Sequence, residues 1–339
     1  MGLTVRSKTI IFILLLFLVL SLTFSASAIS LTNDKIILIL GHLNPITHPS
    51  HDMCLKFASL VEERTNGKLV IEVYPAAQLG SNVELFSGVK AGLVDIGVEP
   101  MSPLVDYNPL FAFTQAMYMF RDVSHMQSVF ASEMFNQLKE ELIQQANLRI
   151  LAVYYFGTRH LTCNKPIYEP KDMEGLRFRS QPSPIDQAVI TAFGATPSPM
   201  SWTEVIPALK FGTIIGQENP IPFIYSSKTY EVQKYIILTG HQMQANPFLM
   251  NEDSFQKLPD EFKAILINSA EEAVSYGTEL TIAQEETLLA ALEKEGMKVI
   301  GPKEGLKLEE FRIKGREFIL KNFGATLGYD IYEKIDAIK

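Results

Sequence analysis

The chain contains 339 residues, of which 47% are hydrophobic and 20% are charged. This length and composition suffice for one large or two medium globular domains and exclude a disordered chain. The net charge is −8 at neutral pH, and no block of Lys and Arg interrupts the acidic character, which argues against a nucleic-acid partner.

The first 28 residues are built like a secretory signal peptide. Two basic residues, Arg6 and Lys8, precede an unbroken apolar run over residues 10–20, and the small residues Ala26 and Ala28 offer a cleavage site. The apolar run is too short to cross a bilayer comfortably, although an uncleaved membrane anchor is the alternative. We therefore expect cleavage after about Ala28 and an exported mature protein.

The cysteines and histidines give no sign of a metal site. Cys54 and Cys163 lie far apart in the sequence, so two buried free thiols and a disulfide are both open for an exported chain. The six histidines are scattered without the spacing of metal ligands. We expect neither a metal nor a cofactor.

The N-terminal half alternates strands and helices. The predicted elements are a strand over 36–40, a helix over 52–65, a strand over 68–74, a helix over 83–91 and a strand over 93–98. This βαβαβ order is typical of a parallel, doubly wound sheet. An amphipathic stripe then predicts one long helix over 123–146, and a strand follows over 149–155.

A second series of strands and helices follows. It comprises a strand over 175–180, a helix from Pro184, a helix opened by a capping box at 201–204 and closed by Gly212, and a strand over 213–217. The longest helical segment runs from Pro259 to about Glu295, and a strand over 297–300 and a helical tail complete the chain. We predict an α/β fold of two lobes, with this helix spanning both and a ligand cleft between them.

The strand at "GLRFRS" carries two arginines on one face, because side chains alternate along a strand. Arg177 lies earlier in the strand, and we expect it to face solvent or a surface acid. Arg179 lies at the end of the strand, and we expect it to enter the cleft.

Polar side chains follow several of the predicted strands, at Glu99, Arg159, Arg179 and Asn219. In open α/β sheets, ligands bind beyond the carboxyl ends of the strands. Two guanidinium groups there suit a carboxylate, which they match bidentately, whereas any single Arg could equally be a solvated loop charge.

Enzyme signatures are weak. The sequence has no nucleophile motif, and "GHLNP" at 41–45 has one Gly where a dinucleotide-binding loop needs three. A site could hide among His42, His48 and Glu99, but isolated His and Glu residues are usually structural or solvated. We therefore expect no enzyme.

Six segments resemble the DctP-type solute-binding proteins of tripartite ATP-independent periplasmic (TRAP) transporters. They are "GKLVIEVYPAAQLGS" (67–81), "FGTRHLTCNKPI" (156–167), "DMEGLRFRSQPSP" (172–184), "GATPSPMSWTEVIPALKFG" (194–212), "GQENP" (216–220) and "YEVQKYIILTGH" (230–241). The resemblance covers essentially the whole mature chain. One departure is Ile215, which stands where the family usually has Asp before "GQENP".

The resemblance implies a periplasmic protein with lobe I over 33–156 and 245–284 and lobe II over 157–244 and 285–339. It implies that Arg179 makes the main salt bridge to a ligand carboxylate. By the same resemblance, supporting contacts to the ligand come from Arg159, Asn219, Glu99 and Trp202, the last by packing against it.

We therefore expect a monomer that captures an organic acid anion by lobe closure and delivers it to TRAP permease membrane subunits. Two alternatives share the pocket: a sensing protein that presents the acid to a signalling receptor, and an exported α/β enzyme. A C4-dicarboxylate, a sialic or sugar acid, and a 2-oxo or hydroxy acid are all open as ligands.

Overall fold

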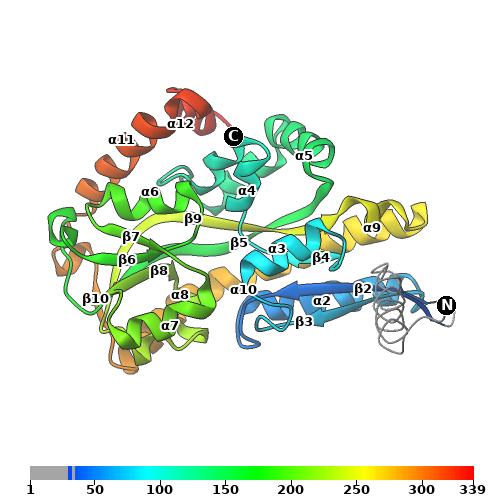
Figure 1. The fold of residues 1–339 in the computed structure, drawn as a ribbon, viewed down its shortest axis with the longest axis horizontal. Coiled ribbons are helices and arrows are strands. Elements are labelled where there is room, and N and C mark those ends of the chain that lie inside the picture. The colour runs from blue at the N-terminus through cyan, green and yellow to red at the C-terminus, as the bar shows by residue number, and fades with distance from the viewer. Residues whose placement is uncertain (1–29, 33–34) are drawn as a thin grey trace, which may run out of the picture.

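The computed structural model describes residues 30–32 and 35–339, so the predicted signal peptide lies outside the described residues. The described chain forms one mixed sheet with helices on both sides (Figure 1). The strand order is β1-β2-β4-β9-β5-β8-β6-β7, with β3 beside β2 and β10 beside β9.

The first unit has the predicted βαβαβ order from β2 onward, preceded by a short strand that was not predicted. It comprises β1 (Ser30–Thr32), β2 (Lys35–His42), α2 (Pro49–Arg64), β3 (Leu69–Tyr74), α3 (Asn82–Lys90) and β4 (Ile96–Val98). Strand β2 pairs in parallel with both β3 and β4, as predicted. Local sequence sets the helix starts: Pro49 occupies the first turn of α2, and a capping box between Ser81 and Glu84 opens α3.

The prediction of one long helix over 123–146 is wrong. Two 3₁₀ helices, η1 (Ser102–Asp106) and η2 (Pro109–Gln115), lead to two separate helices, α4 (Val123–Ala131) and α5 (Glu133–Ala146). Ser132 is extended between them, and its side chain accepts a hydrogen bond from the backbone N–H of Phe135. Apolar residues are buried on both sides of this break, with Met126 and Val129 in α4 and Phe135 and Leu138 in α5, which is why the sequence pattern read as one helix.

Two long antiparallel strands join the halves of the molecule. They are β5 (Leu148–Cys163) and β9 (Tyr235–Asn251), which pair along their whole length with register shifts near Ile150, Tyr155 and Arg159. The sequence analysis ended the first strand at residue 155 and missed the second. Because β9 pairs antiparallel with β4 and β5, the sheet is mixed rather than parallel throughout.

The second unit follows β5. It comprises η3 (Pro170–Met173), β6 (Arg177–Ser180), α6 (Pro184–Ala192), β7 (Thr196–Pro199), α7 (Trp202–Phe211), β8 (Gly216–Pro220), α8 (Ile221–Ser226) and η4 (Thr229–Glu231). After β9 come α9 (Glu252–Gln256), α10 (Asp260–Lys294), β10 (Lys298–Ile300), η5 (Pro302–Glu304), α11 (Leu308–Leu327) and α12 (Ile331–Asp336).

Helix α10 is the predicted long helix, and it spans the molecule from α9 to β10 (Figure 1). It packs against α2 and β5 at one end and against α8 at the other. Gly277 brings it close to α2, because a Cβ there would lie 2.6 Å from the sulfur of Met53. Separate buried clusters lie on the two faces of the sheet, centred on Phe57 and Phe248 in one and on Phe178 and Phe193 in the other.

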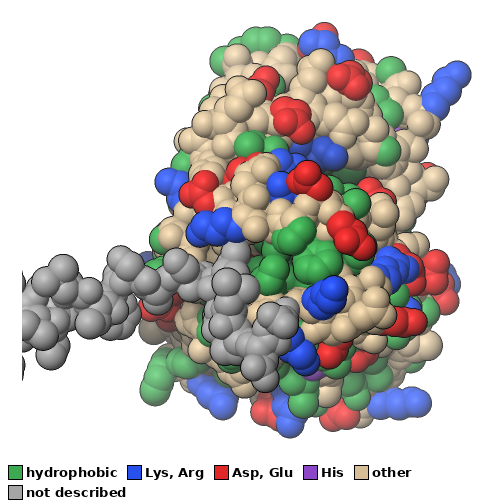
Figure 2. Space-filling model, turned by 90° about the vertical axis from the view of Figure 1, so that its right-hand side faces the viewer, with side chains coloured by type: hydrophobic (Ala, Val, Ile, Leu, Met, Phe, Trp, Pro, Cys, Tyr) green, Lys and Arg blue, Asp and Glu red, His purple; other side chains and the backbone are tan. Residues whose placement is uncertain are grey.

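Cys54 and Cys163 are both buried and free. Within residues 30–32 and 35–339, no helix is long and apolar enough to cross a membrane, and no cluster of three or more His, Cys, Asp or Glu could hold a metal. Figure 2 shows one face of the protein, on which acidic and basic side chains are interspersed around a hydrophobic area near the middle.

Candidate ligand-binding site

A cavity of about 50 Å³ lies where β4, β5, β6, β8 and β9 meet. The five predicted site residues all border it, although they come from four different strands or helices and one loop. The lining consists of Leu43, Asn44, Asn82, Val98, Glu99, Pro100, Phe156, Arg159, Arg179, Gln181, Trp202, Asn219, Phe223, Gln244 and Asn246. A volume of this size holds a few waters, which is less than the clefts that usually hold organic ligands.

The two arginines of β6 take opposite environments, as predicted. Arg177 is exposed, whereas Arg179 is only 3% exposed. The Nε of Arg179 donates to the backbone oxygen of Met200 at 3.2 Å, and its guanidinium lies 5.8 Å from the ring centre of Trp202. No described carboxylate pairs with Arg179, so its Nη groups are available to a ligand in the cavity.

Burial lowers the pKa of Arg179 from 12.5 to about 10, with the carboxylate of Glu218 opposing this effect. The side chain therefore keeps its charge at neutral pH. A buried cation without a paired anion is costly, and an incoming anion removes that cost.

The second predicted arginine is already neutralised by the protein. Arg159 donates from Nη2 to Oε1 of Glu218 at 2.6 Å and from Nε to the other carboxylate oxygen, and its Nη1 donates to Gln244. Burial alone would raise the pKa of Glu218, but Arg159 and then His241 lower it to about 2. Of the two predicted arginines, Arg159 is therefore paired with Glu218, whereas Arg179 has no carboxylate partner among the described residues.

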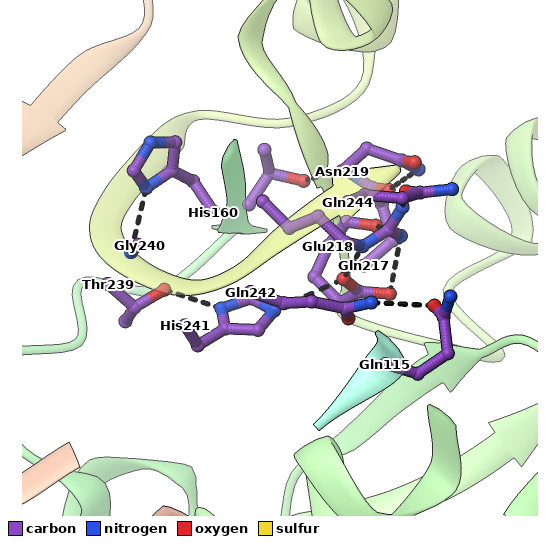
Figure 3. A network of polar contacts seen from close by, with 12 residues as sticks. Gln115, His160, Gln217, Glu218, Asn219, Thr239, Gly240, His241, Gln242 and Gln244 are labelled. Atoms are coloured by element: carbon purple, nitrogen blue, oxygen red, sulfur yellow. Dashed lines mark hydrogen bonds and ion pairs between the residues drawn. The ribbon is translucent and has the colours of Figure 1, made fainter. Parts of the chain in front are cut away.

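A buried polar network extends from this ion pair across β8 and β9 (Figure 3). His241 lies 3.2 Å from Glu218 through Nε2 and 2.8 Å from the hydroxyl of Thr239 through Nδ1. Burial lowers the pKa of His241, which favours the neutral ring. A neutral ring satisfies both contacts by donating from Nε2 to Glu218 and accepting from Thr239 at Nδ1.

Amide side chains in and behind the cavity wall continue the network. Asn219 donates to Gln217 at 2.6 Å, and Gln244 donates to Asn246 at 2.8 Å. Gln242 donates to Gln115 of η2 at 2.7 Å (Figure 3). These bonds fix the rotamers of the lining amides before any ligand arrives, which lowers the entropic cost of binding.

Glu99 is a buried acid in the cavity wall, in contrast to the buried base Arg179. It lies directly after β4, as predicted. This side chain is 3% exposed, and its Oε1 has no hydrogen-bond partner among the described residues. Burial raises the pKa of Glu99 well above its usual range and so favours the uncharged acid. Glu99 can then donate as well as accept a hydrogen bond.

An aromatic wall closes one side of the cavity. Trp202 meets Phe223 edge-to-face with ring centres 4.6 Å apart, and Phe156 lies 5.9 Å from Phe223. His48 stacks on Phe156 from behind at 4.9 Å. Burial lowers the pKa of His48 to about 3, so this histidine acts as a neutral packing residue and not as part of an acid–base site.

Comparison with known proteins identifies the family of this chain. The sequence profile of the bacterial extracellular solute-binding proteins, family 7, matches residues 40–321. The chain belongs to this family. Family 7 is also the group that the sequence resemblance indicated, the DctP-type proteins.

Individual members of family 7 agree with this assignment. The 2,3-diketo-L-gulonate-binding periplasmic protein YiaO of Escherichia coli is 31% identical over 77% of this chain and 79% of its own length. A TRAP periplasmic solute-binding protein of Roseobacter denitrificans with bound L-galactonate has a TM-score of 0.84 and 29% identity, covering 89% of this chain and 98% of that one. A corresponding protein of Sulfurospirillum deleyianum with bound succinate has a TM-score of 0.83 and 27% identity, covering 89% and 99%.

These family-7 relatives are two-lobed transport proteins, and so the predicted fold class is confirmed and an enzymatic role is not supported. Two details of the sequence analysis need correction. Arg159 lies inside β5 and Asn219 inside β8, not beyond the ends of these strands. Both nevertheless border the cavity, and they lie on neighbouring antiparallel strands, with Arg159 opposite Pro220 and His160 opposite Asn219.

Sequence reasoning missed Glu218, which sits in the quoted "GQENP" segment directly before Asn219. A buried acid between two strand residues was the available signal, since a carboxylate in a strand core needs a cationic partner. It also missed Gln244 and Asn246, because the whole of β9 was missed.

Proposed function

We propose that this protein captures an organic acid outside the cytoplasm and delivers it to the membrane subunits of a TRAP transporter. One observation carries the proposal: Arg179 is a buried guanidinium at the cavity without an anionic partner among the described residues. A carboxylate would supply that partner in bidentate geometry. The solved relatives hold acids, L-galactonate in one and succinate in another, which supports the same class of ligand.

The other lining residues have distinct proposed roles. Asn219 offers an amide held by Gln217 at the cavity, and Trp202 packs its ring against the ligand. Glu99 meets a polar part of the ligand. Arg159 acts indirectly, because its donors to Glu218 and Gln244 hold the strand wall in place.

We further propose lobe I over 33–156 with 245–284 and lobe II over 157–244 with 285–339. The three crossings between these lobes lie at one level of the structure. Tyr155 pairs with Ala245 and Gly157 with Gln244 across a register shift, and Glu285 of α10 accepts from the backbone N–H of Thr158 at 2.8 Å. A rotation at this level would open and close the cavity as a hinge.

The remaining parts of the proposal concern where the protein works. The matched family supports a periplasmic location. We propose that the signal peptide is cleaved after about Ala28, and mass spectrometry of exported protein would then find a mature start near Ile29. We also propose that the protein is a monomer, because each chain carries a complete cavity of its own.

The decisive experiment compares three variants of the mature protein by calorimetry against a panel of organic acids. Trp202 is the only tryptophan, and its fluorescence provides an independent readout. Arg179→Ala should weaken binding roughly 30- to several-thousand-fold, because losing one partner of a buried charge pair costs about 2–5 kcal/mol. Arg179→Lys should also weaken binding, since an ammonium lacks the bidentate fork.

Arg177→Ala is the matched control. It removes the exposed arginine of the same strand and should leave affinity and stability nearly unchanged. If Arg179→Ala binds the acid as tightly as the unaltered protein, the proposed carboxylate site is refuted. If no organic acid in the panel binds the unaltered protein, the proposed function itself fails.

A further inference from the structure

The charge balance of the cavity limits how many carboxylates it can take. Arg159 and Arg179 are the only cationic side chains among the described lining residues. Arg159 is already paired with Glu218, because its guanidinium donates to both carboxylate oxygens of that residue. A single guanidinium, Arg179, is therefore left to neutralise a ligand. A second carboxylate would enter a site with no free cation and with the carboxyl of Glu99 in its wall.

A different part of the lining holds polar atoms that lack partners. The Oδ1 of Asn82, the Oε1 of Glu99 and the Nε2 of Gln181 are buried and make no hydrogen bond within the described residues. They include both acceptors and a donor. A hydroxyl group donates and accepts through one oxygen, so a row of hydroxyls would satisfy this mixture, whereas a carboxylate only accepts. An alkyl chain would leave all three atoms unsatisfied.

These atoms lie at the boundary between the cavity and an adjoining groove. The groove has a volume of about 350 Å³ and is lined by residues of α3, η1 and the loop before α6. It shares four lining residues with the cavity: Asn82, Glu99, Pro100 and Gln181. A ligand with its carboxylate on Arg179 can extend past Glu99 into this groove, which gives room for a longer chain than a C4-dicarboxylate.

We infer that the solute is a monocarboxylate with a polyhydroxylated chain, of the aldonate class, with its hydroxyls held by Asn82, Glu99 and Gln181. This inference rests on the proposed function and narrows it. It separates this protein from a dicarboxylate binder, which needs a second free cation, and from a binder of simple fatty acids, which needs an apolar chain site.

The test measures binding of four kinds of acid to the mature protein by calorimetry: six-carbon aldonates (gluconate, galactonate and gulonate), succinate, hexanoate and adipate. The tightest aldonate should bind at least 100-fold more tightly than hexanoate, because sites built for hydroxyls strongly reject analogues that lack them. It should exceed succinate and adipate by a similar factor. If succinate, adipate or hexanoate binds as tightly as the best aldonate, the inference is overturned. The proposed carboxylate site at Arg179 would still hold in that case.

A matched variant locates the hydroxyl contacts. Glu99→Leu replaces an unpartnered buried carboxyl by an apolar group of similar size, a change that folded proteins tolerate well. It should weaken aldonate binding 10-fold or more and leave hexanoate binding within a factor of three. Glu99→Gln keeps a donor and an acceptor and should retain most of the aldonate affinity. If Glu99→Leu loses affinity for aldonate and for hexanoate by the same factor, Glu99 does not bind the ligand hydroxyls.

Discussion

At the scale of single residues, the partner decides what a buried charge does. Arg159 and Arg179 are 2% and 3% exposed, and both border the cavity. Arg159 has a protein carboxylate and therefore stiffens the wall, whereas Arg179 has none and therefore favours an anionic ligand. The pKa of Glu218, about 2, keeps the first pair ionised across the physiological range. The two arginines would look interchangeable in a list of lining residues.

Asp186, in the first turn of α6, is the second buried acid near these arginines and behaves oppositely. Burial raises its pKa from 3.8 to about 6, although Ser102 and Arg159 oppose the shift. The folded state then binds more protons than the unfolded state between these values, so this group's contribution to stability falls as pH rises from about 4 to 6. Two units correspond to about 3 kcal/mol.

Asp186→Asn removes this titration. Relative to the unaltered protein, the variant's free energy of unfolding should rise by about 1–3 kcal/mol between pH 4 and pH 7.5. Urea unfolding followed by Trp202 fluorescence at several pH values measures this difference. A difference between the two proteins that stays constant with pH would contradict the assignment of a raised pKa to Asp186.

At the scale of elements, the contact between α10 and α2 depends on one glycine. A Cβ at Gly277 would lie 2.6 Å from the sulfur, 2.8 Å from Cγ and 2.9 Å from Cβ of Met53. Gly277→Ala raises helix propensity by up to about 1 kcal/mol, but the overlap with Met53 should cost about 1–3 kcal/mol. We expect a net loss of stability in chemical unfolding.

A double-mutant cycle isolates this contact. Met53→Ala alone creates a cavity and destabilises the protein, but it also makes room for a Cβ on α10. The double variant should therefore be more stable than the sum of the single effects predicts, by about 1 kcal/mol or more. Strict additivity would mean that α10 and α2 shift apart instead of clashing.

Elements with local signals were predictable from the sequence. The capping box at Ser201 and the glycine at position 212 marked helix ends that the structure reproduces. The start of α10 after Pro259 was equally visible. Strand β9 was not predictable in this way, because both its faces are buried and it contains Gly240 and Pro247, so it shows no regular alternation.

The sequence predicted several residues that line the cavity, but it did not predict which of their charges are paired. Five of its lining residues were named from the sequence: Arg159, Arg179, Trp202 and Asn219 lie in motif segments, and Glu99 follows a predicted strand. The pairing of Arg159 with Glu218 depends on the antiparallel register of β5 and β8, which places residues 59 apart in sequence side by side. No local pattern carries that register, and so the number of free cations could not be counted from the sequence.

At the scale of the whole molecule, the small cavity implies motion. Because the cavity at Arg179 measures only about 50 Å³, we expect the free protein to adopt a more open form that closes on the ligand. We expect X-ray scattering of the ligand-free protein to give a larger radius of gyration than scattering at saturating ligand. Arg179→Ala should show no compaction at the same ligand concentration. Identical radii with and without a proven ligand would exclude hinge closure as the transport signal.

The long pairing of β5 with β9 also has a consequence for the order in which the protein folds. Strand β4 ends at residue 98, yet one of its two edges pairs with residues 248–250 of β9. The start of β5 likewise pairs with residues 249–251, which are synthesised about 100 residues later. A growing chain therefore cannot complete its first half until three quarters of it has been synthesised. Contacts between such distant segments form slowly. The unfinished chain accordingly lacks its native sheet until late in synthesis, so we expect its N-terminal half to stay unfolded until β9 is available.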